Sequence, residues 1–151
     1  YPAASTERQI LDLVRSEARR GGGIGPVAAA AVVSQDDILA ARNAVLDLHM
    51  AESVEQYLIE LVLATRQPLS YGDDLQRWMA YGGSPRATIA LDRCARAHAW
   101  LDDRDYVDPA DVQNVFPDVL RHRLILSFEA ETEGVDVNHC IQTLLERVNA
   151  P

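Results

Sequence analysis

Apolar residues recur along most of this chain at the three- and four-residue spacing of amphipathic helices. No stretch alternates between apolar and polar over more than about five residues, so little of the chain has the pattern of a strand. Glycine and proline gather at a few places and leave long uninterrupted stretches between them. The pattern predicts helices over 6–20, 35–49, 53–66, 85–101, 109–122 and 137–148, with one more helical turn at 73–78. We therefore expect an all-α fold, a helical bundle of five to seven helices with at most one very short β pairing.

The chain divides into two parts on this pattern. Residues 1–33 are expected to form a linker helix and a Gly/Ala-rich connection, and residues 34–151 a helical domain that begins at the N-cap Ser34. The glycine-rich stretch 21–26 is expected to be the loosest segment. In the second part, Pro117 is expected to end one helical turn and begin another.

Two short segments of the second part favour extended structure. They are Tyr106-Val107 and the segment 124–126, and we expect them to pair with each other.

The helix over 85–101 is apolar on two faces, which predicts a central position in the bundle. One of its apolar strips contains Ala87, Leu91, Cys94, His98 and Leu101. Cys94 and Cys140 are therefore expected to be reduced, metal-free core residues rather than a disulfide. A metal site built from these cysteines with His98 and His139 is disfavoured, because adjacent residues such as 139 and 140 point to different faces of a helix.

Composition narrows the class of protein. With 151 residues, 48% of them hydrophobic and 25% charged, the chain is typical of a globular protein of one domain or two small ones. A net charge of -9 argues against nucleic-acid binding, and no apolar run is long enough for a membrane span. We expect a cytoplasmic protein. Because its first residue is Tyr1 rather than Met, we also expect it to be part of a longer chain.

One charged residue stands out. Arg86 lies in the first turn of the helix over 85–101, where a cation opposes the macrodipole at a cost of roughly 0.3 to 1 kcal/mol. Ser84 is a good N-cap, Pro85 suits the first helical position, and Gly82-Gly83 allow close approach of a ligand. An arginine beside the free amides at the start of a helix is typical of a binding site for a phosphate or a carboxylate.

A structural role for Arg86 remains open at this point, since Asp73 or Asp74 could pair with it. Arg93 lies seven residues further along, and Arg121-His122-Arg123 forms a second basic cluster that could serve a helix C-terminus. No Gly-x-x-x-x-Gly-Lys-Ser/Thr phosphate-binding loop and no Gly-x-Ser-x-Gly elbow occurs in the chain.

Four segments resemble the helical lid of the MoxR family of AAA+ ATPases. They are Tyr81-Gly82-Gly83-Ser84-Pro85-Arg86-Ala87, Arg93-Cys94-Ala95-Arg96-Ala97, the segment from Arg104 to Val112, and the segment from Val119 to Leu124. Upstream, Tyr1-Pro2 with the segment 7–11 is similar to the segment that follows the last strand of that family's nucleotide-binding core, and the segment 32–41 resembles the start of its lid. Gly83 stands where alanine is usual, and the stretch 21–26 has no counterpart.

This resemblance implies that Arg86 is the sensor 2 residue, which contacts the γ-phosphate of ATP, with Gly83, Ser84 and Pro85 beside the nucleotide. It implies ATP and Mg²⁺ in the full-length protein, bound by an ATPase core that precedes Tyr1. The chain alone is then expected to have no ATPase activity and to bind neither ATP nor Mg²⁺ tightly. The family also implies a homo-oligomeric ring, usually a hexamer, and chaperone-like remodelling of partners such as von Willebrand factor A domain proteins.

Two other functions stay open on the sequence. The chain could be a stand-alone helical protein-protein interaction module with no nucleotide role. It could also be a helical DNA-contacting domain, although its negative charge and its lack of a basic recognition helix argue against that reading.

Overall fold

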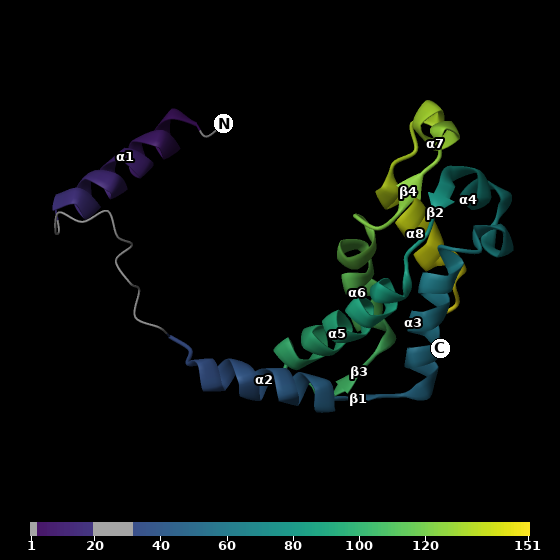
Figure 1. The fold of residues 1–151 in the computed structure, drawn as a ribbon, viewed down its shortest axis with the longest axis horizontal. Coiled ribbons are helices and arrows are strands. Elements are labelled where there is room, and N and C mark those ends of the chain that lie inside the picture. The colour runs from purple at the N-terminus through teal and green to yellow at the C-terminus, as the bar shows by residue number, and fades with distance from the viewer. Residues whose placement is uncertain (1–2, 20–31) are drawn as a thin grey trace. The chain divides into compact units, whose positions relative to one another are not determined.

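The structure, a computed structural model, describes residues 3–19 and 32–151 (Figure 1). The chain forms two compact units, Tyr1–Ile38 and Leu39–Pro151. The stretch 21–26, expected to be loose, lies outside the described residues. No helix in the described part is both long enough and apolar enough to cross a membrane.

The all-α prediction is confirmed. The α-helices are α1 (Ala4–Arg19), α2 (Gln35–Asp47), α3 (Glu52–Ala64), α4 (Asp73–Trp78), α5 (Pro85–Leu101), α6 (Pro109–Leu120), α7 (Phe128–Glu133) and α8 (Val137–Arg147). A 3-10 helix, η1, covers Pro68–Tyr71. The described residues thus hold eight α-helices rather than five to seven, and α7 is the one without a counterpart in the sequence prediction. Its signals are local, because the Ser127 hydroxyl accepts a hydrogen bond from the Ala130 amide and Gly134 ends the helix in the left-handed conformation.

The part of the chain that the structure describes contains two short strand pairings, where at most one was expected. Strand β1 (His49–Met50) pairs in parallel with β3 (Tyr106–Val107), and β2 (Met79–Tyr81) pairs antiparallel with β4 (Ile125–Leu126). The predicted pairing of 106–107 with 124–126 is therefore wrong. Strands of two or three residues carry no periodic pattern, so helix packing decides which of them meet.

The predicted helix starts are confirmed at Ser34, at Ser84-Pro85 and at Asp108-Pro109. At the start of α6 the Asp108 carboxylate accepts hydrogen bonds from the amides of Ala110 and Asp111. The Asp108 amide in turn donates to the Asp111 carboxylate, which completes a capping box. The predicted break at Pro117 is wrong, because α6 continues through this residue to Leu120. One missing amide is a tolerable loss in a helix that is otherwise well capped and packed.

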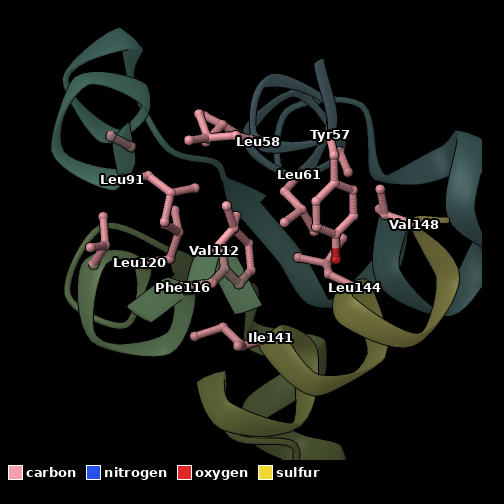
Figure 2. Close-up of a cluster of buried hydrophobic side chains, with 14 of the residues drawn as sticks. Tyr57, Leu58, Leu61, Leu91, Val112, Phe116, Leu120, Ile141, Leu144 and Val148 are labelled. Carbon is pink, nitrogen blue, oxygen red and sulfur yellow. The ribbon is translucent and has the colours of Figure 1, made fainter. Parts of the chain in front are cut away.

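The hydrophobic core lies within the second unit, where α3, α5, α6 and α8 meet. Figure 2 shows side chains from these helices converging, among them Tyr57, Leu61, Phe116 and Leu144. All four are at most 2% exposed. Burial of such large apolar side chains is the main source of stability for the unit.

Helix α5 faces this core with residues four apart, Ala87, Leu91, Ala95 and Ala99. The predicted strip through Cys94 and Leu101 is therefore partly wrong: Cys94 is exposed, and Leu101 is 74% exposed. Alanines at three of the four positions let α5 pack closely against α6. Cys140 is buried as expected, both thiols are free, and burial raises the pKa of Cys140 to about 11.

The two phenylalanines of the chain provide a matched test of this core. Phe116 is fully buried, whereas Phe128 is 79% exposed at the start of α7. Phe116→Ala should lower the free energy of unfolding by about 3 to 5 kcal/mol, because it leaves a cavity. Phe128→Ala should change it by about 0.5 kcal/mol or less. Urea unfolding followed by circular dichroism measures both, and equal losses would contradict the assigned core.

Candidate functional site

The loop before α5 is fixed to the end of α3. The Gly83 amide donates a hydrogen bond of 2.9 Å to the Thr65 hydroxyl, which itself donates to the carbonyl of Val62 at 2.6 Å. The Arg66 guanidinium donates through Nε to the carbonyl of Gly83. Three hydrogen bonds therefore set the position at which the chain enters α5.

Gly82 is required by this attachment. A Cβ at Gly82 would lie 2.2 Å from the carbonyl oxygen of Thr65, far inside contact distance. At Gly83 a Cβ would lie 3.0 Å from Leu120 Cδ1 and 3.1 Å from Ala87 Cβ, which is tight but less severe. The two glycines thus allow the loop to approach the protein's own α3 and α6, a contact that the sequence interpretation had assigned to a ligand.

At the start of α5, Ser84 occupies the N-cap position and Pro85 follows at the first helical position. The Ser84 side chain makes no capping hydrogen bond, although its carbonyl accepts from the Ala87 amide at 2.7 Å. Neither the amide nor the guanidinium of Arg86 has a partner among residues 3–19 and 32–151, and the side chain is exposed. The helix therefore begins with donors that remain available.

The internal partners considered for Arg86 do not bind it. Asp74 instead receives two hydrogen bonds of 2.6 Å from Arg147, which hold the pKa of this carboxyl well below its usual range. Asp73 is exposed and pairs with no cation in the part of the chain that the structure describes. An exposed, unpaired guanidinium at the positive end of a helix is suited to an anion.

The other basic residues have different surroundings. Arg121 contacts Asp118 and Asn138, and Arg123 donates to the carbonyl of Val119. This basic cluster therefore serves the end of α6, as its alternative interpretation predicted. Arg93 is exposed on α5 and makes no ion pair within the described ranges.

Sequence reasoning missed a buried carboxylate, Asp111 in the first turn of α6, which contacts the C-terminal end of α5 through His98. Asp111 is only 1% exposed, accepts hydrogen bonds from both terminal nitrogens of Arg104, and lies 2.7 Å from His98 Nδ1. Burial alone would raise the pKa of Asp111, but the bonds from Arg104, the Asp108 amide and His98 outweigh it and lower the pKa to about 2.

Metal binding has one geometric candidate among the described residues, formed by His98, Asp102 and Asp111, whose ligand atoms lie within 4.8 Å of one another. The Arg104 guanidinium already occupies both oxygens of Asp111 and contacts Asp102. A metal ion would have to displace this arginine, so the cluster is an ion-pair network that joins α5 to α6.

Residues 76–144 match the family described as the AAA lid domain. The chain is similar to Chaperone MoxR1 of Mycobacterium tuberculosis, with 35% identity over 99% of the chain and 39% of that protein. It is also similar to Protein MoxR of Methylorubrum extorquens, with 35% identity over 66% of the chain and 31% of that protein.

A solved structure from Cytophaga hutchinsonii, described as a proposed ATPase, superposes with a TM-score of 0.82 at 38% identity. It matches 100% of this chain and 44% of that one. The chain therefore spans less than half the length of these relatives.

The buried carboxylate gives a pH test. Since its pKa is about 2 in the folded protein and 3.8 in the unfolded chain, Asp111 adds stability that is present above pH 3.8 and is lost as the pH falls toward 2. Asp111→Asn should cost about 2 kcal/mol or more near neutral pH and flatten the acid limb of the stability profile. Urea unfolding as a function of pH measures this effect.

The control for this test is Asp118→Asn. The Asp118 side chain is 80% exposed and pairs with Arg121. This variant should keep the acid limb of the wild-type protein, and an identical flattening in both variants would show that Asp111 has no special role.

Proposed function

Because this chain belongs to the AAA lid domains of the MoxR-type AAA+ ATPases, we propose that it is the moving lid over a nucleotide bound by an ATPase core of the same protein. In this proposal the core supplies the phosphate-binding loop and holds ATP and Mg²⁺. The lid contributes Arg86 as its sensor 2 residue, directed at the γ-phosphate. Gly83, Ser84 and Pro85 form the backbone beside it.

The observation that carries this proposal is the state of Arg86. Its guanidinium is exposed and has no partner among the described residues, although it stands where the macrodipole disfavours a cation. A phosphate oxygen would remove that conflict and would also accept the unpaired Arg86 amide. The residues present therefore fit an anionic group.

The same geometry suggests how the lid would respond to nucleotide. Arg86 lies on the first turn of α5, whose far face is buried in the core of the unit, and the loop before it is bonded to Thr65 and Arg66. A force on the guanidinium would be transmitted to α3 and α5 together, because close-packed helices shift as rigid elements. Loss of the γ-phosphate would then release the lid as one body.

At the level of the whole protein, we propose a ring-shaped homo-oligomer, a hexamer in most AAA+ proteins, that remodels partner proteins in the cytoplasm, where ATP is available. The MoxR and chaperone names of the relatives support a remodelling role, and a von Willebrand factor A domain protein is the proposed type of partner. The chain alone has no phosphate-binding loop lysine, so it should not hydrolyse ATP.

Arg86→Ala in the protein that joins this chain to its ATPase core tests the proposal. Loss of a charge-assisted bond to a phosphate that gains charge in the transition state should reduce ATP turnover on the order of 10²-fold. Arg86→Lys should restore only part of the rate, because an ammonium cannot reproduce the planar guanidinium. Steady-state phosphate release measures both variants.

The matched control is Arg93→Ala, which removes from the same helix an exposed arginine that has no ion pair among residues 3–19 and 32–151. It should leave turnover unchanged, and both alanine variants of the isolated chain should melt within about 4 °C of the wild type. Full turnover by folded Arg86→Ala protein would favour the alternative, a helical interaction module without a nucleotide role.

A further inference from the structure

A shallow apolar groove lies between the C-terminal ends of α2 and α5, at the opposite end of α5 from Arg86. It encloses about 500 Å³, and its apolar lining comes from Ala44, Leu48 and Trp100. Trp100 is 37% exposed, and its indole N–H has no hydrogen-bond partner in the described part of the chain. Leu101, the next residue in the chain, is 74% exposed.

The remaining lining residues are charged. Asp47, Asp103 and Asp105 are exposed, and none of these carboxylates pairs with a cation within residues 3–19 and 32–151. Arg104 also lines the groove, but its guanidinium is bound to Asp111 and Asp102. The groove therefore combines an apolar floor with a rim of uncompensated negative charge.

We propose that this groove is a docking site for a basic segment of a partner protein. An aliphatic side chain of that segment lies on the floor, and an arginine or lysine beside it meets the rim carboxylates. Charge complementarity selects this occupant, since the rim carboxylates repel acidic segments and would find no cationic partner in a neutral one. The long apolar stems of arginine and lysine match an apolar floor, and the Trp100 ring can accept the cation on its face.

This inference does not depend on nucleotide. Arg86 and the groove lie at opposite ends of a helix of 17 residues, so a partner could occupy the groove while Arg86 faces a phosphate. The two sites can therefore be tested and can fail separately.

The probe is the peptide acetyl-Gly-Arg-Leu-Arg-Gly-amide, titrated into the 151-residue chain labelled with ¹⁵N. Trp100 and Trp78 are the two tryptophans of the chain, and Trp78→Phe assigns the indole signals. We expect a saturable shift of the Trp100 indole N–H. The acidic peptide acetyl-Gly-Glu-Leu-Glu-Gly-amide should cause none.

Charge variants test whether the rim carboxylates contribute to the affinity for the arginine peptide. Asp47→Asn combined with Asp105→Asn should weaken the arginine peptide about fivefold, the loss expected for two exposed ion pairs. Asp73→Asn, an exposed carboxylate on α4 outside the groove, should leave the affinity within about twofold of wild type.

The proposal is overturned if the arginine peptide does not shift the Trp100 signal, or if the Asp47→Asn, Asp105→Asn protein binds the peptide with the same dissociation constant as the wild type. It is also overturned if Asp73→Asn weakens binding as much as the rim variants, because the attraction would then come from the net charge of the chain alone. The proposal is likewise overturned if the chain forms a dimer without peptide and this dimer covers Trp100, because the groove would then serve self-association.

Discussion

The attachment of Gly83 to Thr65 is the contact on which the rest of the site depends. It joins two positions 18 residues apart, and it requires Gly82, because any side chain there would collide with the Thr65 carbonyl. The hydrogen bond from Arg66 adds a second link to the same loop. Through this attachment the end of α3 determines where α5 begins, and therefore where Arg86 is presented to solvent.

The far end of α5 is fixed by different chemistry. His98 and Arg104 converge on Asp111, a carboxylate that is buried and that also completes the cap of α6. A buried carboxylate is costly unless every lone pair is used, and here the arginine, the histidine and the Asp108 amide use them. Helix α5 is thus held at both ends, and its small buried residues let it lie close to α6 between them.

Much of this fold could be predicted from local sequence. Pro85 and Pro109 each suit the first helical position, and the Asp108 side chain also caps the start of α6. Both helix starts were placed correctly. The core-facing side of α5 could not be assigned in the same way, because two of its strips are apolar and alanine gives a weak signal. Cys94 was therefore assigned to the core, whereas Ala95 occupies that position.

The contacts that hold the site together depend on residues distant in sequence. Nothing near Thr65 indicates that it binds Gly83, and Asp111 looks like an ordinary acid in the first turn of a helix. The sequence prediction of the β pairing was wrong for the same reason, since each observed pairing is decided by the packing of helices that are remote in the chain. Arg86 could be singled out from the sequence as a candidate because its anomaly is local: a cation in the first turn of a helix.

The proposed contact between Arg86 and nucleotide is tested most directly by a crystal structure of the protein that joins this chain to its ATPase core, bound to a non-hydrolysable ATP analogue and Mg²⁺. We expect the Arg86 guanidinium to donate a hydrogen bond to a γ-phosphate oxygen, while the hydrogen bond from the Gly83 amide to the Thr65 hydroxyl remains. An Arg86 side chain that pairs with a carboxylate of the core, or that stays in solvent beside a fully bound nucleotide, would contradict it.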